Sequence, residues 1–189
     1  MNFRQEILKY QPINEQERKD KEITLGYIDQ FIENILTREN KIAHMTSSGL
    51  ILNKSLDKIL MIHHNIYNTW TWTGGHADGD TDMLKVALKE AKEETGLLDI
   101  VPLTYDLASI DIIPVYGHIK RGEYVSSHLH LNTSYILIGD EREELVINQE
   151  ETSDVGWVEV NRLDQYSNEP YLIEIYNKII EKAKSVNII

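Results

Sequence analysis

Residues 74–97 constrain this chain more than any other part of the sequence. The segment opens with two glycines, passes through the polar residues 78–82, and then reads as a helix of strong helix formers that stops at Gly96. The last turns of this helix carry three carboxylates at positions i, i+3 and i+4: Glu90, Glu93 and Glu94. Residues at these spacings lie on one face of a helix, so the three acidic groups are predicted to converge.

This placement of the carboxylates is unfavourable unless a cation compensates for it. The C-terminal end of a helix carries the negative pole of the macrodipole, where basic side chains are preferred. Glu90, Glu93 and Glu94 are therefore either exposed to water or arranged around a cation. A hard divalent ion with oxygen ligands, Mg²⁺ or Mn²⁺, is the cation that such a cluster favours.

The whole segment resembles the Nudix box, the signature of the Nudix hydrolase family. That signature is a glycine, five residues, Glu, seven residues, Arg-Glu, an apolar residue, any residue, Glu-Glu, any residue, glycine and an apolar residue. In this sequence the fixed positions fall on Gly75, Lys89-Glu90, Glu93-Glu94 and Gly96-Leu97. Two positions depart from the pattern. The early Glu position holds Thr81, with Asp80 beside it as a substitute carboxylate, and the Arg position holds Lys89.

The resemblance implies a set of roles for these residues. Glu93 and Glu94 would be the main metal ligands, and Glu90 would be a further ligand or the base. Lys89 would orient Glu90, paired with Asp80, and the backbone carbonyl of Gly75 would complete the coordination. Nudix enzymes often place another glutamate before a late strand, which here falls on Glu151, six residues before Trp157. Glu150 is a neighbouring competitor, and an exposed acidic loop is the alternative interpretation.

The composition limits the classes of partner. The 189 residues carry a net charge of −12, which argues against broad nucleic-acid binding. No stretch reaches the length of a transmembrane span, and the first ten residues do not read as a signal peptide. With no cysteine there is no thiolate chemistry, and a cytoplasmic location is the expectation. An anionic substrate would need bound divalent cations to approach such an acidic protein.

Periodicity divides the chain into an N-terminal helical extension, residues 1–40, and a domain over residues 41–189. Asn14 is a predicted cap for a helix whose apolar stripe packs on the domain or, alternatively, forms a homodimer contact. The stripe consists of Ile23, Tyr27, Ile28, Phe31, Ile32 and Ile35. The expected strands lie at residues 45–52, 58–63, 100–110, 112–120, 127–138 and 155–160, with a closing helix at 169–184. The apolar stripe predicted for this helix is Leu172, Ile175, Tyr176, Ile179 and Ile180. This order predicts an α+β fold. The resemblance implies the same, a Nudix-like α/β/α sandwich with a mixed sheet.

Several residues outside the carboxylate cluster are candidates for substrate binding. His76 follows Gly75 directly, and His128 and His130 alternate on a predicted strand, so their side chains face the same way. Such a histidine pair contacts substrate, packs in the core or binds a transition metal. The remaining candidates are a tryptophan that could stack on a base and two basic residues that could contact phosphate: Trp72, Lys120 and Arg121.

These features predict a Mg²⁺- or Mn²⁺-dependent hydrolase that cleaves the diphosphate of a nucleoside diphosphate linked to another group. The small-molecule diphosphate would be its partner, with no nucleic acid or membrane. An isoprenyl-diphosphate isomerase is the first alternative, suggested by the glycine-histidine pair at Gly75-His76, although that chemistry also uses a cysteine. A non-catalytic nucleotide-binding regulator is the second.

Overall fold

The computed structural model describes residues 3–66, 68–120, 122–148 and 152–186. Its main feature is an eight-stranded sheet in which β10, β2, β1, β9 and β5 lie in that order, while β3, β4 and β6 pair with β2, β1 and β9. The strands of this sheet are β1 (Ala43–Leu52), β2 (Lys58–His64), β3 (Thr69–Thr71), β4 (Thr73–His76), β5 (Val101–Pro102), β6 (Ser109–Val115), β9 (His128–Ile138) and β10 (Thr152–Glu159). β1 and β9 run parallel and the other pairs run antiparallel, so the sheet is mixed.

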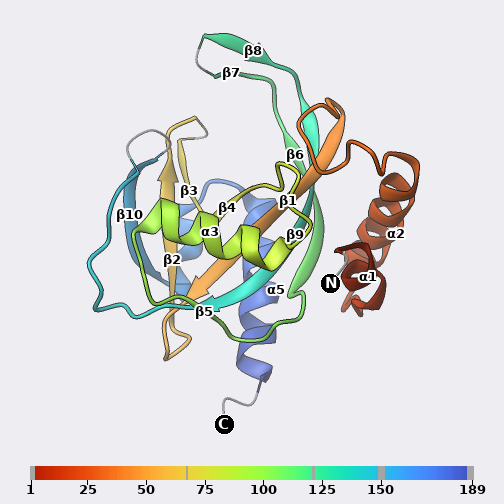
Figure 1. Cartoon of the computed structure of the whole chain (residues 1–189). Coiled ribbons are helices and arrows are strands. Elements are labelled where there is room, and N and C mark those ends of the chain that lie inside the picture. The colour runs from red at the N-terminus through yellow and green to blue at the C-terminus, as the bar shows by residue number, and fades with distance from the viewer. Residues whose placement is uncertain (1–2, 67, 121, 149–151, 187–189) are drawn as a thin grey trace.

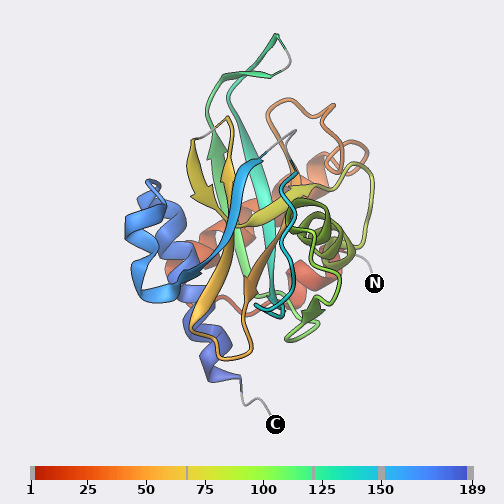
Figure 2. The ribbon, with the colours of Figure 1, turned by 90° about the vertical axis from the view of Figure 1, so that its left-hand side faces the viewer.

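Helices cover both faces of the sheet. They are α1 (Phe3–Lys9), α2 (Glu15–Gln30), α3 (Met83–Thr95), α4 (Leu163–Tyr166) and α5 (Pro170–Ser185), with a 3₁₀ turn at Val160–Arg162. Figure 1 shows α3 crossing in front of the sheet and α5 behind it. Figure 2, turned by 90°, places the blue α5 and the green α3 on opposite sides of the strands. The fold is therefore the predicted α/β/α sandwich, preceded by N-terminal helices.

Each face of the sheet has its own hydrophobic core. On the α3 side, Met45 and Ile51 of β1 pack with Ala87 and Ala91. The same core takes in apolar side chains of the N-terminal helices: Phe3, Ile7 and Ile28. On the α5 side, all five residues of the predicted apolar stripe are buried: Leu172, Ile175, Tyr176, Ile179 and Ile180.

The N-terminal region is helical over a shorter range than the periodicity suggests. Asn14 caps α2 as predicted, since its Oδ1 accepts a hydrogen bond from the Glu17 backbone N–H at 2.8 Å. The helix stops at Gln30, and residues 31–39 form turns in which Ile35 is buried. Ile23 and Ile32 of the predicted stripe are each 54% exposed, so only part of that stripe packs on the domain.

Two of the predicted strands have different bounds. Residues 100–108 contain only the short strand β5, because Pro102 has no N–H with which to extend a ladder, and Ser109 and Ile110 already belong to β6. The strand expected at 112–120 is β6, which ends at Val115. His118–Lys120 forms a separate strand, β7, paired with β8 (Glu123–Val125) in a ribbon that projects from the sheet in Figure 1.

None of the described helices is long and apolar enough to span a bilayer.

Candidate active site on helix α3

Local sequence signals fix both ends of α3. The side chain of Asp82 caps the first turn by accepting a hydrogen bond from the Lys85 backbone N–H at 3.0 Å. Gly96 ends the helix in the left-handed conformation with φ 76°, which glycine adopts without steric cost. The cap and the glycine therefore set the helix in the register that the sequence predicts.

The three glutamates of α3 differ in their exposure to solvent. Glu94 is buried, and its Oε2 accepts a hydrogen bond from the Gly74 backbone N–H at 3.0 Å. The Glu90 side chain is 17% exposed and lies against β4, where a Cβ on Gly75 would overlap its carboxyl group. The Glu93 side chain is 54% exposed. The cluster therefore runs from the β4 backbone outward to solvent, and glycine at position 75 leaves space for Glu90.

Lys89 forms ion pairs with two glutamates of this cluster. Its Nζ lies 3.1 Å from Glu90 Oε1 and 3.2 Å from Glu93 Oε2. The hydrogen bond to Glu90, followed by the charge of that carboxylate, raises the pKa of Lys89. The ammonium thus bridges two of the three glutamates.

Asp80 does not pair with Lys89, so the ion pair predicted between them is wrong. Its Oδ2 lies 2.7 Å from the Lys85 Nζ, and its Oδ1 accepts a hydrogen bond from the Asp82 backbone N–H at 3.0 Å. The short aspartate turns onto the first turn of the helix, where Lys85 is within reach and Lys89 is one turn further away.

The donor atoms of this site suit a hard cation. The carboxylates of Glu90, Glu93 and Glu94 and the backbone oxygen of Gly75 make an all-oxygen set, as Mg²⁺ and Mn²⁺ prefer. The carboxyl group of Glu90 lies against Gly75, where an added Cβ would overlap it. These residues therefore fit the divalent ion that the resemblance implies.

A second polar cluster contains four histidines. One ring nitrogen from each of His44, His76, His128 and His130 lies within 4.8 Å of the others. As predicted, His128 and His130 face the same way, with their Nε2 atoms 3.3 Å apart. His44 was not predicted, because it joins the group only through the parallel register of β1 with β9, in which it pairs with His130.

The remaining candidates lie in different environments. Trp72 is a core residue, 7% exposed and edge-to-face with Tyr176, so its role in substrate binding stays a prediction. Lys120 lies on the β7–β8 ribbon. Burial is the main cause that lowers the pKa of His76, and the charge of Lys120 adds a smaller contribution in the same direction. Arg121 and Glu151 lie outside the described residues.

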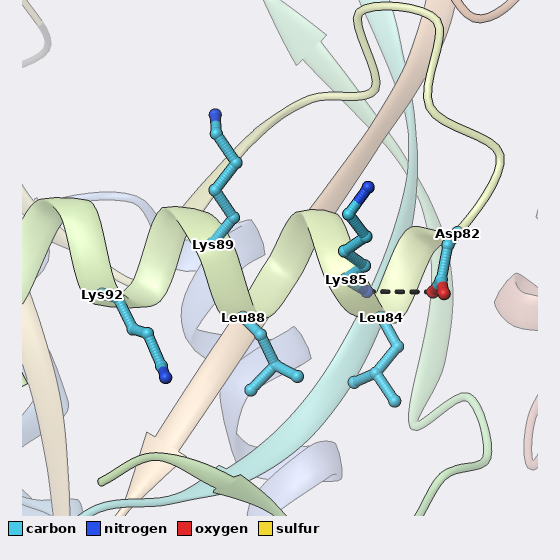
Figure 3. A pocket seen from close by; sticks show the side chains of 6 residues that line it. All are labelled: Asp82, Leu84, Lys85, Leu88, Lys89 and Lys92. Carbon is cyan, nitrogen blue, oxygen red and sulfur yellow. Dashed lines mark hydrogen bonds between the residues drawn. The ribbon is translucent and has the colours of Figure 1, made fainter. Parts of the chain in front are cut away.

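A shallow pocket on the outer side of α3 does not form part of this centre. Six residues line it: Asp82, Leu84, Lys85, Leu88, Lys89 and Lys92. In Figure 3 the Lys89 side chain extends to the side of the helix opposite Leu84 and Leu88. The lining shares Lys89 with the carboxylate cluster but includes none of the three glutamates, so this pocket adjoins the cluster without containing its carboxylates.

Solved structures share this fold at low sequence identity. A MutT protein from Methanosarcina mazei Go1 has a TM-score of 0.56 and 15% identity, covering 77% of this chain and 98% of its own. A Nudix hydrolase from M. smegmatis, RenU, has a TM-score of 0.55 and 16% identity, with coverage of 77% and 89%. A NUDIX family hydrolase from Clostridium perfringens has a TM-score of 0.52 and 20% identity, with coverage of 74% and 97%.

A comparison with curated proteins gives no match. The sequence does match the NUDIX domain over residues 43–181, which takes in the sheet, α3 and most of α5. This match covers well over half of the chain and includes the glycine, lysine and glutamates of the carboxylate cluster. The chain therefore belongs to the Nudix family, as a pyrophosphohydrolase that acts on a phosphorus-containing anhydride.

Proposed function

We propose that this protein is a Mg²⁺- or Mn²⁺-dependent hydrolase that cleaves the diphosphate of a nucleoside diphosphate linked to another group. The observation that carries the proposal is the group of three glutamates on α3, bridged by Lys89 and placed against Gly75. We also propose that it works in the cytoplasm on a small molecule, without nucleic acid or membrane. A homodimer contact would use the exposed Ile23 and Ile32.

The glutamates would hold the metal from one side of α3. When bound, the divalent ion would neutralise phosphate charge and lower the pKa of the attacking water. Glu94 is fixed for this task by the Gly74 N–H, and its burial keeps bulk water away from one side of the cluster. Glu93 and Glu94 are proposed as the main ligands, with Glu90 as a further ligand or as the base.

Lys89 is proposed as a positioning residue. Its ammonium holds Glu90 Oε1 at 3.1 Å and so restricts the directions in which that carboxylate can point. An ammonium makes a point contact, whereas the guanidinium of the family's arginine can bind a carboxylate through two parallel hydrogen bonds. Lys89 would therefore orient Glu90 with less geometric control than arginine.

The proposed substrate contacts lie beyond this cluster. They are the histidines next to Gly75 and on β9, the basic residues of the β7–β8 region and the tryptophan before the glycines: His76, His128, His130, Lys120, Arg121 and Trp72. In a chain with a net charge of −12, Lys120 and Arg121 are the best local candidates for phosphate contact.

A screen of nucleoside diphosphate derivatives tests the proposal. Purified protein is incubated with each compound and Mg²⁺ or Mn²⁺, and the released phosphomonoester is measured through a coupled phosphatase. We expect hydrolysis of at least one compound in the presence of metal and none with a chelator in excess. Turnover that persists in the chelator, or turnover confined to diphosphates that lack a nucleoside, would contradict the proposal.

A further inference from the structure

We propose that His44, His76, His128 and His130 form a binding site for one Zn²⁺-class transition-metal ion, separate from the carboxylate site on α3. Four imidazole nitrogens, one from each residue, lie within 4.8 Å of one another. Imidazole suits zinc, copper and nickel, whereas Mg²⁺ takes oxygen ligands, so this cluster and the glutamates select different metals. The inference does not depend on the proposed hydrolase activity, and it gives His76, His128 and His130 a role in metal binding in place of direct substrate contact.

The sheet places the two sites on opposite faces of β4. Successive residues of a strand point to opposite sides of a sheet. A side chain on Gly75 would run into Glu90 of α3, so the next residue, His76, points to the other face. His76 pairs with Thr46 across the sheet, and His44 is two residues before Thr46, so both histidines share that face. The parallel pairing of His44 with His130 adds β9 to the cluster.

The hydrogen bonds of two histidines already select the tautomer that a metal requires. His44 Nδ1 lies 2.9 Å from the Asn40 carbonyl oxygen, and His128 Nδ1 lies 2.8 Å from the Ser126 carbonyl oxygen. A carbonyl can only accept, so each Nδ1 carries the hydrogen and each Nε2 keeps its lone pair. This pattern, in which one ring nitrogen donates to the backbone, is typical of histidines that ligate metals through the other.

His44 supplies an independent sign that a ligand is missing. The residue is 4% exposed, and its Nε2 is buried without a hydrogen-bond partner in the described structure. A buried polar atom of this kind calls for an explanation, of which an ion is one. The centroid of the His44 ring lies 4.9–5.3 Å from the ring centroids of the other three histidines.

One pair of these nitrogens already has the spacing of a tetrahedral site. Zn–N bonds of about 2.0–2.1 Å place neighbouring ligands about 3.3 Å apart in a tetrahedron. His128 Nε2 and His130 Nε2 already lie 3.3 Å apart, and the other nitrogens need to move inward by side-chain rotation.

Metal binding by the full-length protein tests the inference. Chelator-stripped protein is titrated with Zn²⁺ by calorimetry, and with Co²⁺ by visible absorption, in excess Mg²⁺ so that the carboxylate site is occupied. We expect one Zn²⁺ per chain and the intense d–d bands of tetrahedral Co²⁺. His130→Gln and His128→Gln should each weaken Zn²⁺ binding by about tenfold or more, as loss of a ligand costs at least what loss of a supporting contact does.

Matched variants separate this site from the carboxylates. His63→Gln changes a histidine of β2 outside the cluster, and Glu94→Gln changes the α3 site; both should keep wild-type Zn²⁺ affinity. Imidazole ¹⁵N spectra of the wild type should show Zn²⁺-dependent shifts at Nε2 of His44 and His128, a readout that needs no variant. Absence of Zn²⁺ binding, equal binding by His130→Gln, or loss of binding in Glu94→Gln would overturn the inference. Binding of inorganic phosphate, lost in His130→Gln without any Zn²⁺ uptake, would also overturn it.

Discussion

At the scale of single residues, the three glutamates on α3 differ in their burial. Glu94 is buried and hydrogen-bonded to the β4 backbone, Glu90 fits against Gly75, and Glu93 reaches solvent. The sequence predicts that these three side chains share a face, because helical spacing alone determines it. The differences in burial depend on how α3 packs on β4, which the spacing does not encode.

Glu94→Gln should remove most turnover and leave the fold intact. The amide oxygen can still accept the hydrogen bond from Gly74, but the charge that would hold a hard cation is lost. We expect kcat to fall on the order of a hundredfold or more, by analogy with the removal of one charge-stabilising group in other enzymes. The measurement is steady-state hydrolysis of a confirmed substrate. Glu181→Gln, on α5, is the control and should keep wild-type kinetics. If Glu94→Gln also kept wild-type kinetics, this cluster would not be the catalytic centre.

Lys89→Ala should lower kcat about tenfold with little change in KM, because Glu90 loses its orienting contact and no substrate contact is removed. Lys89→Arg should preserve or raise kcat. Lys85→Ala, which breaks the pair with Asp80 on the same helix, is the matched control. A large rise in KM at unchanged kcat for Lys89→Ala would mean that Lys89 binds the phosphate of the substrate directly.

At the scale of elements, the close approach of β4 to α3 builds the carboxylate site. The helix has local signals for its start and end, so its bounds follow from the sequence within a residue. The pairing of β4 with β1 and the parallel pairing of β1 with β9 join segments far apart in the chain. Sequence periodicity carries no information on that register, and for this reason His44 was missed.

Gly75→Ala tests the contact between these two elements. The added methyl group would overlap the Glu90 carboxyl group and force it away from Lys89. We expect kcat to fall on the order of a hundredfold, since a displacement of about 1 Å can cost that much, while the melting temperature changes little because a flexible side-chain end gives way. Gly156→Ala on β10 is the control, because its nearest neighbour, Trp70, lies at an ordinary 3.8 Å. Equal kcat values for the two variants would contradict the assignment of Glu90.

At the scale of the whole molecule, a buried charge network joins the N-terminal helices to the sheet and to α5. Lys178 Nζ of α5 lies 2.5 Å from Asp111 Oδ1 on β6 and 3.1 Å from Glu17 Oε1 on α2. Both carboxylates have no exposed side-chain surface. The sequence predicts the apolar stripes that pack these elements together, but not this network, because its members come from three distant segments.

Lys178→Met should destabilise the fold strongly. It leaves two buried carboxylates without their cation, and breaking a buried ion pair in this way typically costs about 3–5 kcal/mol. The free energy of unfolding from urea titration is the measurement. Lys184→Met, at an exposed position of the same helix, should change it by no more than about 0.5 kcal/mol. Similar unfolding midpoints for the two variants would mean that the network contributes little to stability.

Thermal unfolding with increasing Mg²⁺ or Mn²⁺ tests the central claim most directly, namely that the glutamates of α3 hold a divalent metal. A ligand that binds only the folded state stabilises it by about 2.7 kcal/mol at a hundredfold excess over Kd. We predict that the melting temperature of the wild type rises with millimolar metal, and that Glu93→Gln combined with Glu94→Gln abolishes the rise without lowering the metal-free value. An unchanged melting temperature in the wild type, or an equal rise in the double variant, would contradict the account.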